Sequence, residues 1–214
     1  MNNPFDFFKE IYCINLDKRP DRWEHAQKEF EKVGILDRVE RISGVDSGEL
    51  NGNIGCNKSH IKCIELAKSR KIENVLVFED DVVFINDTLK VLEKSLKQLD
   101  FSWHMLYLGA NTHQPLFKVK PNLSILKNAF ALHAAAYNQK IYDTILNNFN
   151  ARDKINPNNI LEFYDVWVAH KIQTNYTCLV CNPIIATQYN DFSDIQNTIV
   201  DYSFIEERAK NNIK

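Results

Sequence analysis

Three acidic residues in a row, Glu79, Asp80 and Asp81, lie between two apolar runs in the stretch VLVFEDDVVF. The flanking Val, Leu and Phe are typical of a buried strand, where neighbouring ionised carboxylates repel one another and are costly without a partner. A hard divalent cation such as Mn²⁺ or Mg²⁺ binds carboxylate oxygens and often leaves positions open for phosphate oxygens. The stretch therefore favours a metal site at the end of a strand over a solvated turn that happens to be acidic.

The rest of the sequence offers no glycine-rich cradle for phosphates. It contains neither a P-loop nor a GxGxxG motif, and only six glycines in all. Phosphates would then be held by a cation and by basic side chains. This combination points to a nucleoside diphosphate that binds through a metal ion.

A second polar cluster, INLDKRPDRW, follows another apolar run. Asn15 and Asp17 suit recognition of a base or a ribose, and Arg19 or Arg22 can clamp a phosphate through two hydrogen bonds. The segment is also typical of a helix N-terminus, where Asp21 would favour the helix dipole. Both interpretations can hold at once, so these residues are candidates for binding the nucleotide.

Three shorter stretches contribute single candidates, and each has an ordinary structural alternative. In IGCNKSHIKC, Ser59 can be a helix cap and His60 a histidine packed in the core. In ALHAAAYN, the position of His133 is typical of a core residue. Asp165 in LEFYDVWVAH has aromatic neighbours, which raise a carboxyl pKa and can stack on a sugar ring, as a general base would require. It fits equally well as a polar position on an amphipathic helix. From the residues alone, a structural role is the favoured interpretation for the two histidines, a functional role stays open for both, and Asp165 is undecided.

Alternating strand and helix patterns run through the chain and must position these clusters. The first part reads as a strand ending at Leu16, a helix over about 23–33, a strand in VERIS, a helix over about 58–70 and a strand in NVLVFED. Further strands are predicted in WHMLYLG, FALHAAAYN and TCLVCNPIIATQ, and further helices over about 89–99, 141–149, 161–172 and 198–212. This order predicts an α/β fold with a mixed, mostly parallel, Rossmann-like sheet flanked by helices, in a single domain over residues 1–214.

The polar clusters come directly after the first three predicted strands. NLDKR follows the first, GVD with Asp46 follows the second, and EDD follows the third. Ligands of α/β sheets bind at the carboxyl ends of the strands. The three clusters are therefore predicted to converge on one site.

Composition narrows the class of partner. The formal net charge is −2 and no face rich in Lys and Arg stands out, so nucleic acid is not expected as a partner. No apolar run has the length of a membrane span, and MNNPFDFFKE lacks the apolar core of a signal peptide. We therefore expect a cytoplasmic protein without a transmembrane segment, for which peripheral contact with a membrane stays compatible.

The cysteines do not form a recognisable metal motif. There are five, an odd number, without paired CxxC spacing. Cys178 and Cys181 lie in a predicted strand, where side chains three residues apart point to opposite faces and cannot converge on zinc. Reduced, buried thiols are expected.

In chain order, INLDKRPDRW, ERISGVD, IGCNKSHIKCIE, VLVFEDDV, LYLG, the HA of ALHAAAYN, the D-x-W of YDVW and PIIATQ resemble the glycosyltransferase family 25 domain over about residues 8–196. That family includes bacterial lipopolysaccharide and lipooligosaccharide galactosyltransferases and the procollagen galactosyltransferases. The resemblance implies a GT-A fold, a UDP-hexose donor (galactose or glucose), manganese dependence and an inverting mechanism.

The resemblance also implies roles for the candidate residues. Glu79-Asp80-Asp81 looks like the counterpart of the DxD motif, with Asp81 as the first choice of metal ligand, Glu79 beside it and His133 as a third ligand or a sugar contact. Asp165 is our choice of base for the acceptor hydroxyl. The donor would be contacted by Asn15, Asp17, Arg19, Arg22, Asp46, Ser59, His60, Glu79 and Asp80.

Several positions depart from the family pattern and leave the specificity open. Asn57 and Lys58 replace the usual apolar pair inside IGC-x-x-SH, HAA replaces HAY, and Asn138 replaces a serine.

The acceptor is either a sugar of a surface glycan or lipooligosaccharide, which we favour, or (galactosyl-)hydroxylysine in a collagen-like protein. An alternative from another class is a catalytically inactive nucleotide-sugar-binding scaffold, against which the intact EDD argues.

Overall fold

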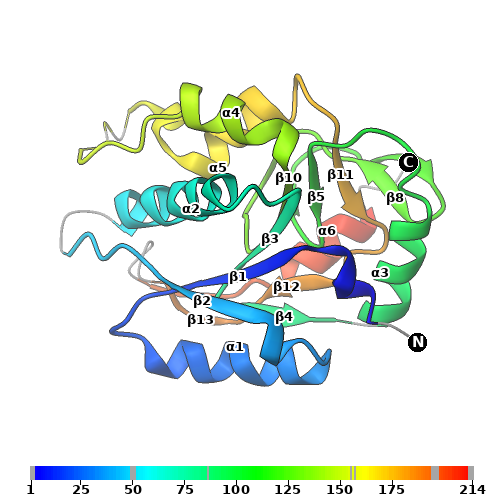
Figure 1. Cartoon of the computed structure of the whole chain (residues 1–214), viewed down its shortest axis with the longest axis horizontal. Helices are drawn as coiled ribbons and strands as arrows, with labels where there is room; N and C mark the ends of the chain where they lie inside the picture. The colour runs from blue at the N-terminus through cyan, green and yellow to red at the C-terminus, as the bar shows by residue number, and fades with distance from the viewer. Residues whose placement is uncertain are drawn as a thin grey trace.

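The computed structural model describes residues 3–48, 52–85, 87–154, 156, 158–193 and 198–211. An eight-stranded sheet with the order β2-β1-β3-β10-β5-β11-β8-β7 forms its centre (Figure 1). Its strands are β1 Glu10–Asn15, β2 Val39–Ser43, β3 Asn74–Glu79, β5 Met105–Tyr107, β7 Phe117–Lys120, β8 Leu123–Ile125, β10 Ala134–Asn138 and β11 Cys178–Cys181.

Six of the eight strands run in one direction. β1 pairs in parallel with β2 and β3, and β5 pairs in parallel with β11. β10 lies antiparallel between β3 and β5, and β8 lies antiparallel between β11 and β7. The predicted fold class, a mixed and mostly parallel sheet flanked by helices, is confirmed.

Helices cover both faces of the sheet, with α2 and α4 on one side and α1 on the other (Figure 1). The helices are α1 Pro20–Lys32, α2 Gly52–Ser69, α3 Thr88–Lys97, α4 Gln139–Asn148, α5 Tyr164–Trp167 and α6 Phe204–Asn211. Single 3₁₀ turns lie at Pro4–Phe7, Leu36–Arg38 and Ile160–Glu162, and a π-helical turn at Val168–Ile172. Short strands also pair outside the main sheet. β4 Val82–Phe84 pairs with β12 Ala186–Gln188, β6 Asn111–Thr112 with β9 Ala129–Phe130, and β13 Asp191–Ser193 with β14 Thr198–Val200.

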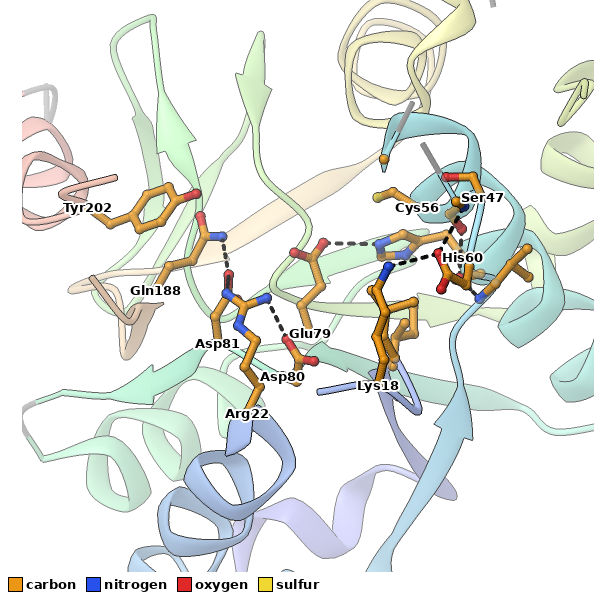
Figure 2. Close-up of a pocket in the computed structure, with 18 residues that line it drawn as sticks. Lys18, Arg22, Ser47, Cys56, His60, Glu79, Asp80, Asp81, Gln188 and Tyr202 are labelled. Carbon is orange, nitrogen blue, oxygen red and sulfur yellow. Dashed lines mark hydrogen bonds and ion pairs between the residues drawn. The ribbon is translucent and has the colours of Figure 1, made fainter. Parts of the chain in front are cut away.

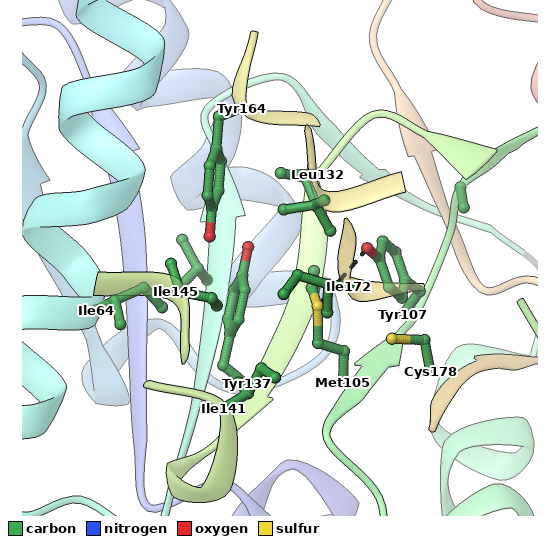
Figure 3. Packing of buried hydrophobic residues seen from close by; sticks show 14 of the residues in the cluster. Ile64, Met105, Tyr107, Leu132, Tyr137, Ile141, Ile145, Tyr164, Ile172 and Cys178 are labelled. Carbon is green, nitrogen blue, oxygen red and sulfur yellow. Dashed lines mark hydrogen bonds between the residues drawn. The ribbon is translucent and has the colours of Figure 1, made fainter. Parts of the chain in front are cut away.

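Each face of the sheet has its own hydrophobic core because side chains alternate along the strands. Along β3, Val75 and Val77 join the core under α2 and α4, whereas Leu76 and Phe78 join the core over α1 and α3. Figure 3 shows part of the first core, where Tyr137 lies among aliphatic side chains from helices and strands. β3 is thus buried on both faces, as its unbroken apolar run predicts.

Some boundaries differ from the sequence prediction. α2 begins at Gly52, six residues before the expected start at Lys58, and the expected helix over 161–172 is broken into a 3₁₀ turn, a short α-helix and a π-turn. A helix was predicted over about 198–212, but Thr198–Val200 form a strand that pairs with β13, because these residues are β-branched, and α6 begins only at Phe204. Residue 212, the predicted end of this helix, lies outside the described residues. In the described part of the chain, none of the helices has the length and apolar character needed to cross a membrane.

Candidate active site

The parallel pairing of β1 with β3 brings two of the predicted clusters together. Ile14 is paired with Glu79, so the residues that follow each strand emerge side by side. The Asn15 amide donates to Oδ2 of Asp80 at 2.7 Å and to the Arg19 carbonyl at 2.9 Å, and its Oδ1 accepts from Arg41 Nε at 2.8 Å. Asn15 is therefore a buried connector that positions the carboxylate of Asp80.

The two aspartates share one arginine. Arg22, from α1, makes ion pairs with Asp80 Oδ1 at 2.9 Å and with Asp81 Oδ2 at 3.1 Å (Figure 2). Gln188, from β12, donates to the same Oδ2 at 3.1 Å. The other oxygen of Asp81, Oδ1, is buried and has no hydrogen-bond partner in the described part of the chain. One buried carboxylate oxygen at the end of β3 thus has no donor among the residues that the structure describes, and a cation would satisfy it.

Burial separates the pKa values of the three acids. Burial, with the nearby charge of Glu79, raises the pKa of Asp81 to about 7, and burial also raises the pKa of Asp80. The pKa of Glu79 is lowered: burial opposes this, but the hydrogen bond and charge of His60 outweigh it. In the protein without metal, Asp81 is consequently the carboxylate least suited to carry an uncompensated charge.

This shift gives the stability of the metal-free protein a pH dependence. The Asp81 pKa is raised from 3.8 to about 7, so between these pH values the folded state holds a proton that the unfolded state has released. Binding of this proton stabilises the folded state at low pH, and the stabilisation is lost as the pH rises from about 4 to about 7. In EDTA, the melting temperature of Asp81→Asn relative to wild type should therefore rise from pH 5 to about pH 7 and level off above it. The exposed Asp100→Asn variant is the control, since Lys120 lowers the Asp100 pKa and its curve should run parallel to wild type. Parallel curves for Asp81→Asn and wild type would show that folding does not raise the pKa of Asp81.

The IGC-x-x-SH stretch forms the start of α2 and the next wall of the site. A Cβ atom on Gly55 would overlap the Val45 carbonyl oxygen, so only glycine permits the contact between α2 and the loop after β2. Ser59 locks the same contact: its hydroxyl donates to the Gly55 carbonyl at 2.7 Å and accepts from Val45 N at 2.8 Å. The next residue, His60, has its Nε2 atom 3.1 Å from Glu79 Oε1. Ser59 therefore has a positioning role, and His60 turns the Glu79 side chain toward α2.

These walls enclose a pocket of about 240 Å³. Lys18 and Asp46, which are 3.0 Å apart, close one side of it, and Gln188 and Tyr202 contribute to the opposite side (Figure 2). Its lining also includes Leu16, Arg22, Val45, Ser47, Gly55, Cys56, Ser59, His60, Glu79, Asp80 and Asp81.

A second pocket of about 360 Å³ shares three residues with the first: Arg22, Asp80 and Asp81. The rings of His25 and Tyr189, stacked 4.5 Å apart, belong to its lining. The acidic pair thus lies between two hollows, which is the arrangement needed if two substrates are to meet there.

Besides Asn15, four predicted site residues lie outside the lining of the first pocket. Asp17 is exposed and bound to Arg41 at 2.7 Å and Ser43 at 2.6 Å, and Arg19 pairs with Asp21. His133 is fully buried, with Nε2 3.4 Å from the Ala186 carbonyl oxygen, and burial lowers its pKa.

Asp165, the fourth, stands at the start of α5, where its Oδ1 accepts from Val166 N at 2.8 Å. Its pKa is raised by burial and also by the charge of Glu79, so it lies within electrostatic reach of the site without lining the pocket.

The lining residues that were missed from the sequence include Lys18, Cys56, Gln188 and Tyr202. Gln188 belongs to PIIATQ, which the family order included without a role, and it reaches Asp81 only through the pairing of β12 with β4. Lys18 and Cys56 stand inside the quoted motifs INLDKRPDRW and IGCNKSHIKC, and membership of these motifs was the available signal.

Comparisons with known proteins identify relatives of this chain. Residues 47–152 match the model of glycosyltransferase family 25 (LPS biosynthesis protein). An inactive glycosyltransferase 25 family member 3 from Homo sapiens is 29% identical over 137 residues, which cover 50% of this chain and 23% of that protein. Procollagen galactosyltransferase 2 from Homo sapiens is 28% identical over 153 residues, covering 57% of this chain and 24% of that protein.

The chain thus spans about a quarter of the length of these two relatives. The crystal structure of A197 from STIV has a similar fold, with a TM-score of 0.51 at 8% identity over 89% of this chain and 92% of that one. The matched segment holds α2 and the EDD stretch, which both contribute residues to the pocket lining. The chain belongs to glycosyltransferase family 25.

Proposed function

We propose that this protein transfers a hexose, galactose in the first place, from a UDP-sugar to an acceptor hydroxyl with inversion at the anomeric carbon. The observation that carries the proposal is the buried Oδ1 of Asp81, which lacks a hydrogen-bond partner in the described structure and borders the pocket at the ends of β1, β2 and β3. Galactose is preferred because a relative of this chain is a procollagen galactosyltransferase.

The acidic pair fits a hard divalent cation, Mn²⁺ or Mg²⁺. Asp81 Oδ1 would be a ligand and Asp80 a neighbouring carboxylate, and both donate only oxygen, the atom type that these ions prefer. When bound, the cation supplies positive charge that neutralises the diphosphate of the departing UDP. Glu79 is turned to His60, and His133 lies outside the pocket lining, so both are weaker candidates for this ion than the sequence suggested.

The remaining pocket residues orient the donor. Lys18 and Arg22 bring positive charge to its lining and suit phosphate oxygens, while Asp46 and the backbone of the loop after β2 suit the hydroxyls of a ribose. Leu16 and Val45 provide an apolar surface on which a base can pack. Asn15 and Ser59 act behind this layer by holding Asp80 and the loop in place.

Asp165 is the proposed base for the acceptor hydroxyl. Burial raises its pKa, which brings a carboxylate closer to the proton affinity of a useful general base at neutral pH. Asp165→Asn should lower kcat by about 10²- to 10⁴-fold, the usual contribution of general-base catalysis, with UDP affinity unchanged. Steady-state kinetics and UDP titration measure the two effects, with Asp143→Asn, an exposed carboxylate on α4, as the control. Near-normal turnover of Asp165→Asn, beside an inactive Asp81→Asn, would show that the base is another residue.

The experiment that tests the proposal is a screen of UDP-hexoses with Mn²⁺, read as UDP release with two acceptor classes. One class is lipooligosaccharide, in line with the description of the matched family, and the other is hydroxylysine or galactosyl-hydroxylysine peptide, in line with the procollagen relative. We expect release from UDP-galactose, or from UDP-glucose, that increases with one of the two acceptors. Absence of release with every donor and acceptor would contradict the proposal.

A second candidate is a catalytically inactive nucleotide-sugar-binding protein. It is favoured by one observation, the 29% identity to an inactive glycosyltransferase 25 family member 3. It predicts tight UDP binding with no turnover of any donor, an outcome that the same screen, combined with UDP titration, identifies.

A further inference from the structure

We propose that Cys56, His60 and Glu79 form a second metal site, suited to a borderline-soft cation such as Zn²⁺ and distinct from the oxygen-rich pair Asp80 and Asp81. The inference goes beyond the proposed transfer reaction and does not rest on it, because metal binding at this site needs no turnover.

Two elements bring the three side chains together. Cys56 and His60 are four residues apart on α2, a spacing that places both on one face of the helix, and Glu79 stands at the end of β3 opposite that face (Figure 2). One ligand atom from each, sulfur, nitrogen and oxygen, can be chosen so that all lie within 4.8 Å of one another. The His60 Nε2 and Glu79 Oε1 atoms are already 3.1 Å apart.

This spacing is close to that of a bound zinc ion. With bonds of about 2.0–2.3 Å, the ligand atoms of a tetrahedral zinc site lie roughly 3.3–3.8 Å apart. The three atoms therefore need to move by about 1 Å at most, which side-chain rotation can provide. Three protein ligands leave the fourth position open toward the pocket that all three residues line.

The chemistry of the ligands distinguishes the two sites. A thiolate and an imidazole favour Zn²⁺ over Mn²⁺ or Mg²⁺, whereas the carboxylates of Asp80 and Asp81 favour the harder ions. On binding, the Cys56 thiol would lose its proton to solvent and form the metal–sulfur bond as a thiolate.

The surroundings of the three residues suit a cation, and His60 and Glu79 are already in contact with each other. The His60 side chain is 2% exposed, and its Nδ1 is buried with no hydrogen-bond partner among the described residues. Cys56 is a free cysteine, and the carboxylates of Glu79, Asp165 and Asp81 act electrostatically on its sulfur.

The test uses Co²⁺ as a spectroscopic probe of the reduced full-length protein. Cobalt bound to a thiolate gives a sulfur-to-metal charge-transfer band in the near ultraviolet, which oxygen and nitrogen ligands do not produce. We expect this band in the wild type, saturating at a single equivalent and displaced by Zn²⁺. It should be lost in Cys56→Ser and retained in Cys63→Ser, a buried cysteine seven residues further along the same helix.

Asp81→Asn should retain the band, because the proposed site does not use Asp81. No band in the wild type, or a band that persists in Cys56→Ser, would overturn the proposal.

A second measurement needs no variant and covers the case in which Cys56→Ser does not fold. Zn²⁺ should slow alkylation of Cys56 in the wild type, followed by mass spectrometry of its peptide. The four buried cysteines, 13, 63, 178 and 181, serve as internal references whose labelling should not respond to Zn²⁺. Equal labelling of Cys56 with and without Zn²⁺ would refute the site.

Discussion

Replacing Asp81 by asparagine should abolish hexose transfer while leaving the protein folded. The substitution keeps the size of the side chain but removes the charged oxygen that lacks a partner within the described residues, and with it the main proposed ligand of the hard cation. We expect kcat/KM to fall by more than about 100-fold, because even a residue that only supports a metal ligand accounts for about 10- to 100-fold. Mn²⁺ binding, followed by calorimetry, should be lost in parallel.

Two variants make this prediction specific. Asp100→Asn removes an exposed carboxylate that pairs with Lys120 and should leave activity unchanged. Asp80→Asn should reduce activity less than Asp81→Asn does, since both Asp80 oxygens already have partners in Arg22 and Asn15. If Asp81→Asn retained Mn²⁺ binding and turnover, the proposed metal site at the end of β3 would be wrong.

Replacing Gly109 by alanine should have the largest effect on stability. A Cβ atom at this position would overlap the Ala186 carbonyl oxygen and lie 2.8 Å from His133 Nε2. The overlap cannot be relieved by rotating a side chain, because Leu108 holds this backbone by accepting hydrogen bonds from Ile185 N at 2.8 Å and Ala186 N at 3.3 Å. We expect a loss of at least about 3 kcal/mol in the free energy of unfolding, the upper part of the range for overpacked sites.

The loss should be measured by chemical denaturation beside Gly48→Ala. Gly48 has a φ of 62°, and a Cβ atom added there would meet no described atom within 4 Å, so alanine at this position introduces backbone strain alone, about 1–2 kcal/mol. Gly109→Ala should be clearly the more destabilising variant. It should also lower transferase activity, since the displaced segment carries Gln188 to Asp81. Equal losses for the two variants would show that the contact between Gly109 and Ala186 is not tight.

The part of the site that could be predicted from the sequence depends on neighbouring parallel strands. The apolar run before EDD predicts a buried strand, and the alternation of strands and helices predicts that the ends of the first three strands lie together. The structure places β2, β1 and β3 side by side, with Asn15 bonded to Asp80 and with Asp46 and Asp80 on one pocket. Local sequence patterns are sufficient to predict that these strand ends converge, because sheets with strand–helix–strand connections have few alternative topologies.

Contacts between distant segments could not be predicted in the same way. Gln188 reaches Asp81 across 107 positions of sequence, and the direction in which Glu79 turns is decided by His60 on α2. His133, the predicted third ligand or sugar contact, is buried beside Ala186 by the antiparallel position of β10 and the close approach of Gly109. Such placements depend on tertiary packing, which the periodicity of one segment does not contain.

Anomalous diffraction from crystals grown with Mn²⁺ and UDP tests the central claim most directly. We expect an anomalous difference peak for manganese at coordination distance from the Asp81 carboxylate. The diphosphate should lie beside it, and the nucleoside should lie in the pocket that Lys18, Val45 and Asp46 line. A manganese ion located away from Asp81, or a nucleotide bound outside this pocket, would contradict the proposed active site.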